Sequence, residues 1–260
     1  MRLRAPASKI VAMAVLLAGC HRGPNVAAVA GVRVTSAGYE PGSERASGES
    51  NAGFLGEVGG SAREYDLRDG ISTRGAGDLY VGGNTSGPAA QLRLELAVGP
   101  ALELGSEEHA LFTRAAFAFD LERNPYSGNL SLELPTLEAG YVFHGSDDGH
   151  VEVYARGGLA TAGSAYARAA AAPFLAAPEV GVAVAAFGPL AAAEASYTRV
   201  FEGPPLDVVR ALGCLGWGLV VCGDARVTHA TYVDEAGAER ELTGYYGGVT
   251  FGVGVVWGRE

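Results

Sequence analysis

The chain has 260 residues, of which 48% are hydrophobic and 8% aromatic, and its formal net charge at pH 7 is −10. An acidic chain is repelled by phosphate, so we expect no nucleic acid partner. The length suits one barrel or sandwich. Glycine, with 39 residues, is more frequent than a typical enzyme core requires, which favours a protein of strands and turns.

The first 19 residues have the pattern of a signal peptide. Arg2, Arg4 and Lys9 stand without an acidic residue ahead of the apolar run 10–17. This run is much shorter than the roughly 20 residues that a membrane-spanning helix needs. We therefore expect export of the chain and removal of residues 1–19.

The segment at the expected cleavage site is Leu17-Ala18-Gly19-Cys20. It resembles the bacterial lipobox, in which small residues precede a cysteine that carries diacylglycerol. The resemblance implies that Cys20 becomes the first mature residue, that it bears fatty acids such as palmitate, and that lipoprotein-export machinery handles the chain. His21 stands where Asp would signal inner-membrane retention, which implies the outer membrane of a Gram-negative bacterium. The alternative is an ordinary secretory cleavage that leaves Cys20 as a free thiol.

Residues 20–87 are expected to form a lipid-anchored strand followed by a tether. The strand is placed at 25–38, where apolar residues alternate with others. Residues 39–87 are polar and rich in glycine and serine, so they are interpreted as a long loop that can hide one short strand near 78–81.

The remainder, 88–260, is predicted to be an all-β, antiparallel up-and-down β-barrel. Apolar and polar residues alternate with a period of two, and glycine-rich turns separate the alternating segments. About eight strands are expected, or nine or ten if 25–38 and a segment within 202–221 join the sheet. The best helical candidate, 206–212, is interpreted as a short loop helix. The eight strands are expected near 89–104, 109–122, 129–144, 150–165, 176–187, 189–201, 222–233 and 240–257.

The two faces of these strands differ in composition. The apolar faces are long, with aromatic residues toward the strand ends, and the opposite faces mix charge with glycine and alanine. The last strand alternates apolar residues from Tyr245 to Trp257. In these features 89–257 resembles the small outer-membrane β-barrels of Gram-negative bacteria. The resemblance implies outer-membrane lipid around the apolar face, insertion by barrel-assembly machinery and a charged lumen.

The order of the turns conflicts with that class in one place. Outer-membrane barrels keep their short turns in the periplasm. Counted back from the C-terminus, the tight Gly188-Pro189 turn falls outside and the long connection 202–221 falls inside. Either a strand lies within 202–221, or the barrel is not a standard one.

Several charged residues share the predicted inward face. They could line a conducting pore. The preferred interpretation is a network of arginine–carboxylate pairs, because buried charge must be paired and eight strands leave no wide channel. The residues assigned to this lumen network are Arg93, Glu95, Arg114, Asp120, Glu152 and Arg156.

Cys214 and Cys222 are predicted to form a disulfide, since they remain in an oxidising compartment once Cys20 is acylated. A continuous strand would hold their Cα atoms about 26 Å apart at roughly 3.3 Å per residue, so bonding requires a chain reversal. Gly216-Trp217-Gly218 lies midway and supplies a turn. The alternative is two unpaired thiols on one strand.

The sequence shows no motif for catalysis or metal binding. His144 and His150 flank Asp147 and Asp148, which could hold a cation. The preferred interpretation of this segment is a solvated acidic turn. We expect no enzyme activity, no cofactor and no metal.

Taken together, these features predict a lipid-anchored outer-membrane β-barrel with a structural or surface-interaction role and an unidentified cargo. An alternative is an anchored barrel that is itself soluble and holds an apolar ligand, as lipocalins do. A lipid-acting hydrolase is the least favoured interpretation.

Overall fold

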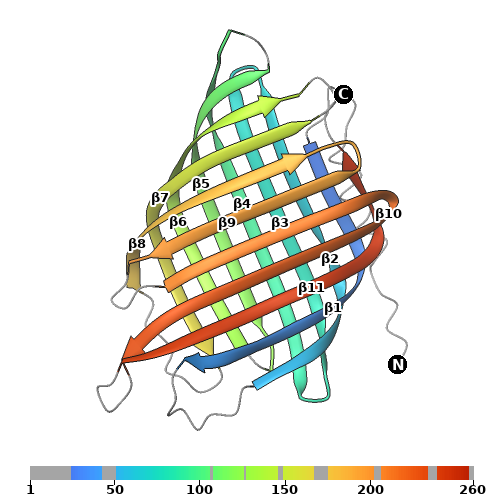
Figure 1. Ribbon diagram of the computed structural model, residues 1–260, viewed down its shortest axis with the longest axis vertical. Coiled ribbons are helices and arrows are strands. Elements are labelled where there is room, and N and C mark those ends of the chain that lie inside the picture. Colours follow the sequence, from blue (N-terminus) through green and yellow to red (C-terminus); the bar gives the residue numbers. More distant parts are fainter. Residues whose placement is uncertain are drawn as a thin grey trace.

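The structure is a computed structural model, and it describes residues 25–42, 51–105, 108–125, 127–145, 149–166, 175–201, 206–233 and 239–257. Over these ranges eleven strands close into one barrel, in which all neighbouring pairs are antiparallel. Figure 1 shows them wound obliquely around the barrel. The strands are β1 (Asn25–Gly42), β2 (Asn51–Arg68), β3 (Ile71–Asn84), β4 (Gly87–Glu103), β5 (His109–Arg123), β6 (Ser127–His144), β7 (His150–Tyr166), β8 (Leu175–Phe187), β9 (Ala191–Val200), β10 (Leu206–Val233) and β11 (Glu239–Trp257).

The antiparallel up-and-down barrel predicted from the alternation is confirmed, but the expected count of about eight strands is too low. The eight expected segments correspond to β4 to β11, and the segment 25–38 belongs to β1, which closes the ring between β2 and β11. The predicted signal peptide, 1–19, and Cys20 lie outside the described residues. Among the residues described, no helix is long and apolar enough to cross a membrane.

The prediction of a loop or tether over 39–87 is wrong for β2 and β3, which are full members of the barrel. The polar composition of β2 belongs to its inward face. Glu57 and Arg63 are buried there, whereas Phe54 and Val58 are exposed on the outside. A strand with a charged inner side therefore has the composition of a solvated loop.

Strand β10 consists of two arms that run in opposite directions. Residues 206–215 pair with β9, whereas 217–233 pair with β11. Strand directions cannot alternate around a closed ring that has an odd number of segments, so eleven antiparallel strands require one reversal. Figure 1 shows β10 doubled back on itself. With its two arms counted separately, the ring has twelve segments. The prediction of a loop helix at 206–212 is wrong, because these residues belong to the first arm of β10. The strand suspected within 202–221 is therefore present.

Side chains alternate across the barrel wall, with apolar residues outward and polar residues inward. On β4, Leu94 and Leu96 are exposed, whereas Gln91 and Glu95 are buried. A water-soluble barrel has the opposite arrangement, with its apolar face inside. The lipocalin-like alternative is therefore not favoured.

The two ends of the barrel differ in their filling. We call the end at which Val26 of β1 pairs with Trp257 of β11 the proximal end, and the opposite end the distal end. Two clusters of buried apolar side chains lie inside the barrel toward the proximal end. They include Tyr65, Phe187, Val220 and Val256 in one cluster and Phe112, Val142 and Tyr154 in the other.

Candidate functional site: the charged barrel interior

Beyond the apolar proximal layer, the interior is a network of buried arginines and carboxylates. Its most enclosed part is centred on Arg114 of β5, whose Nε donates to Glu138 of β6 at 2.9 Å and whose Nη2 contacts Glu152 of β7. Arg74 of β3 contacts the same Glu138 and also Glu95. Two cations and three carboxylates from five strands thus share one group of ion pairs.

A second group surrounds Arg33 of β1. Its guanidinium donates to Gln91 at 2.8 Å and to Asp224 at 2.5 Å. The same group lies over the rings of Tyr80 and Tyr246, with its Cζ atom 4.3 and 4.9 Å from the two ring centroids. The charge is therefore satisfied by an anion, an amide and two aromatic faces, all from different strands.

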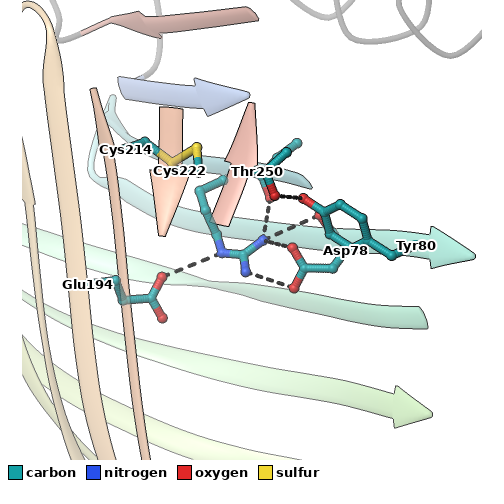
Figure 2. The surroundings of a disulfide bond; sticks show 9 residues. Asp78, Tyr80, Glu194, Cys214, Cys222 and Thr250 are labelled. Carbon is teal, nitrogen blue, oxygen red and sulfur yellow. Dashed lines mark hydrogen bonds and ion pairs between the residues drawn. A yellow bond between two sulfur atoms is a disulfide. The ribbon is translucent and has the colours of Figure 1, made fainter. Parts of the chain in front are cut away.

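The third group links the network to the cystine. Arg63 and Asp78 form a two-bond pair, with nitrogen–oxygen distances of 2.9 and 2.8 Å, and Glu194 lies 3.7 Å from Arg63 Nε. Figure 2 shows Asp78 and Glu194 near the disulfide of Cys214 and Cys222. The apolar layer and the charged interior therefore adjoin at β10.

The two arms of β10 bring further cations to the network. Asp120 of β5 accepts from Arg210 of the first arm at 2.7 Å and lies 3.5 Å from Arg226 of the second arm. Arg226 also contacts Glu122. The first arm of β10, which the sequence suggested was part of a loop, therefore contributes Arg210, and this arginine pairs with Asp120 of β5.

The six residues assigned to the lumen from sequence are all in or beside this network. Arg93 contacts Glu95, and Arg114 contacts Glu152. Arg156 donates to Thr198 at 2.8 Å and lies 4.0 Å from Glu179. Sequence reasoning missed several further members, because the strands carrying them were interpreted as loop or were not aligned with a partner. These are Arg33, Glu57, Arg63, Arg74, Asp78, Glu138, Glu194, Arg210 and Asp224.

The network leaves little free space. The polar cavity between Arg33, Arg63, Asp78 and Arg210 has a volume of about 40 Å³, which is room for a water molecule or two. The arginines and carboxylates around this cavity are paired with one another, and the apolar clusters lie nearer the proximal end. The part of the interior around this cavity is therefore filled mainly by paired arginines and carboxylates.

The predicted disulfide is confirmed. Cys214 and Cys222 lie on the two arms of β10 with their Cα atoms 4.1 Å apart, and both are buried. Gly216 and Gly218 between them have φ angles of 116° and 76°, which favour glycine. The reversal that the cysteine spacing required is thus built by glycine in the expected place.

The histidines of the described ranges are dispersed, apart from one pair. His109 contacts Tyr141, and His229 Nδ1 lies 3.2 Å from Thr243 Oγ1. His144 and His150 approach each other across β6 and β7. The acidic residues between them, 147–148, lie outside the described residues.

Comparisons with known proteins find only distant likeness. No protein-family model matches the chain, and no curated protein matches it. Among solved structures, the translocator domain of the autotransporter NalP from Neisseria meningitidis is 14% identical with a TM-score of 0.35, covering 94% of this chain and 95% of that one. The β domain of the Bordetella autotransporter BrkA is 13% identical with a TM-score of 0.34, covering 86% and 99%. Scores of this size assign no function to the chain.

Proposed function

We propose that the chain is an integral outer-membrane β-barrel with a closed lumen and a structural or surface-interaction role. The observation that carries this proposal is the inverted wall, in which large apolar side chains face outward and charged ones are buried in pairs. Such a wall is stable where lipid surrounds the barrel, because hydrocarbon solvates the outer face and the closed ring leaves no backbone group unpaired at an edge.

The connections between strands support an orientation. At the proximal end they are short, as at 69–70 and 188–190, whereas the distal end carries 43–50 and 167–174. Bacterial outer-membrane barrels have short periplasmic turns, longer extracellular loops and an even number of strand segments. The proximal end, with both ends of the barrel chain, is therefore assigned to the periplasm. The twelve segments also remove the conflict that the turn order raised.

A lipid on Cys20 fits this orientation. Cys20 precedes Asn25, the first residue of β1, by five positions. Five residues reach at most about 18 Å when fully extended. Acyl chains on Cys20 would therefore enter the periplasmic leaflet next to the barrel. The mature N-terminus, analysed by mass spectrometry, should be an acylated cysteine, and an unmodified N-terminus elsewhere would exclude the anchor.

The membrane proposal can be tested with the protein's two tryptophans. Trp217 and Trp257 are both on the outside near the proximal end, with their ring centroids 5.2 Å apart. In vesicles of brominated phospholipid their fluorescence should be quenched, more by bromine near the headgroup than by bromine deep in the acyl chain. Unquenched fluorescence would mean that the barrel does not enter lipid. The closed lumen further predicts no steady conductance when the protein is reconstituted in planar bilayers.

The absence of an enzyme role is part of this proposal. The buried carboxylates and arginines are engaged with one another. A catalytic group needs access to its substrate. Incubation of the reconstituted protein with phospholipid should therefore release no fatty acid.

A further inference from the structure

The contact between His144 and His150 lies at the proximal end of the barrel. His144 is the last residue of β6 and His150 the first of β7, and the two are direct partners in the register. Their ring centroids are 4.9 Å apart, and their Nδ1 atoms are 3.4 Å apart. That separation is longer than the 2.7–3.2 Å of an ordinary hydrogen bond with a nitrogen donor.

The same separation suits two ligands of one metal ion. Zinc binds imidazole nitrogens at about 2.0–2.1 Å in a tetrahedral arrangement, which places two ligand nitrogens about 3.3 Å apart. The nitrogens that approach each other here, one from each ring, are both Nδ1. Imidazole is a preferred ligand of zinc, copper and nickel, whereas magnesium and calcium prefer oxygen.

The surroundings of His150 supply the second feature of a metal-bound histidine. Its Nε2 atom is buried without a hydrogen-bond partner among the described residues and lies 3.6 Å from Oε2 of Glu152, which is within ion-pair distance but beyond hydrogen-bond length. The other oxygen of Glu152 contacts Arg114. Histidines that bind a metal usually direct their second ring nitrogen at a carboxylate, which fixes the tautomer and the ring orientation. The side chains of His150 and Glu152 are each 2% exposed, so water does not compete for this contact.

We propose that the proximal end carries a site for one divalent transition-metal ion of the zinc class, with Nδ1 of His144 and Nδ1 of His150 as ligands and Glu152 as a positioning residue. No group of three or more histidine, cysteine or acidic side chains suited to a metal ion is found among the described residues. In this proposal the two histidines are the ligands from the described residues, and solvent fills the positions that they leave open. The ion bridges the ends of β6 and β7 and holds this hairpin closed at the rim.

The test is a calorimetric titration of the full-length protein in detergent micelles with zinc chloride alone. Wild type should bind one ion per chain, and His144→Ala and His150→Ala should each weaken binding at least 10-fold. Two other histidines provide matched controls. His109→Ala removes a ring at the same end of the barrel, and His229→Ala removes one that contacts Thr243; both should bind zinc as wild type does.

The positioning role is tested by Glu152→Gln, which should keep one ion per chain but bind it about 10- to 100-fold more weakly. Because this change also affects Arg114, its fold is checked by thermal melting. If the variant does not fold, a measurement on wild type still tests the metal site. Zinc should slow the modification of half-buried His144 by diethyl pyrocarbonate and leave the modification rate of His109 unchanged. Equal affinity of wild type and His144→Ala, or equal modification rates with and without zinc, would overturn the proposal.

Discussion

Single residues inside this barrel depend on the charge opposite them. A carboxylate or guanidinium removed from water loses several kcal/mol of solvation, and only a well-placed partner of opposite charge compensates for this loss. Glu138 illustrates the consequence, since one buried carboxylate accepts from both Arg74 and Arg114. These positions therefore require the shape of arginine as well as its charge, because a planar guanidinium can bridge two carboxylates at once.

Replacing Arg114 with alanine should strongly destabilise the barrel. The arginine side chain is fully buried, and its removal leaves Glu138 and Glu152 each without one cation. Breaking a buried pair in this way costs about 3–5 kcal/mol. Urea unfolding in detergent micelles, followed by tryptophan fluorescence, measures the difference.

Arg68→Ala is the matched control. Arg68 lies 4.0 Å from Asp66, and its side chain is 42% exposed, so the change should cost less than about 1 kcal/mol. Equal losses in the two variants would show that the Arg114 network is solvated.

Among the elements, β10 decides how the ring closes. Its first arm pairs with β9 and its second with β11, so the reversal between the arms is a part of the barrel wall. The disulfide and two glycines with positive φ hold that reversal together. A misfolded turn at this point would leave two neighbouring strands without partners.

Removing the disulfide with the double change Cys214→Ala and Cys222→Ala should lower the free energy of unfolding by about 2–3 kcal/mol. The bond closes a short loop, with a sequence separation of 8, and therefore restricts the unfolded chain. Urea unfolding of the oxidised protein and the variant gives the difference. In addition, alkylation of the unfolded protein without reductant should modify neither cysteine, and modification of both would contradict the bond.

Gly218→Ala should cost about 1–2 kcal/mol, for a reason that concerns the backbone alone. Gly218 has φ of 76°, yet a Cβ atom there would meet nothing within 4 Å, so the penalty is that of a left-handed conformation for an L-residue. Gly223, on the second arm, has the same open space and an ordinary φ. Urea unfolding should show Gly223→Ala equal to or more stable than wild type, and equal losses at both positions would exclude this explanation.

For the molecule as a whole, the outward apolar face and the paired interior are two parts of one arrangement. Twelve segments enclose more space than the eight that side chains just fill, and the arginine–carboxylate network with the proximal apolar layer occupies it. The barrel is therefore supported from within by charge pairs, and in the proposed membrane setting lipid stabilises its outer face.

A charge on the outer face should report the depth of the surrounding membrane. Leu96 lies in the middle of β4 and is 68% exposed, whereas Leu104 lies just beyond the proximal end of the same strand. In lipid vesicles Leu96→Arg should cost about 2–4 kcal/mol and Leu104→Arg about 0–1 kcal/mol, because the cost of arginine falls from the bilayer midplane to the interface. Unfolding titrations in vesicles measure both, and equal small losses would place the barrel in water.

The sequence by itself determined the elements in which period-two alternation is strong. It located most of β1, β4 to β9, the second arm of β10 and β11, placed six charged residues in the lumen region, and predicted the Cys214–Cys222 bond from spacing and glycine. Apolar alternation is a local property, so it can be read without knowing any partner strand.

Only the tertiary structure decided the rest, because it depends on pairing between distant segments. Strands β2 and β3 carry so much inward charge that their composition matches a loop, and they are strands because Arg63, Arg74 and Asp78 find partners of opposite charge on other strands of the sheet. The first arm of β10 became visible through its register with β9, and the parity of a closed antiparallel ring required it. The meeting of His144 and His150 likewise follows from the pairing of β6 with β7. Alternation fixes which residues face inward, and closure of the ring fixes which of them meet.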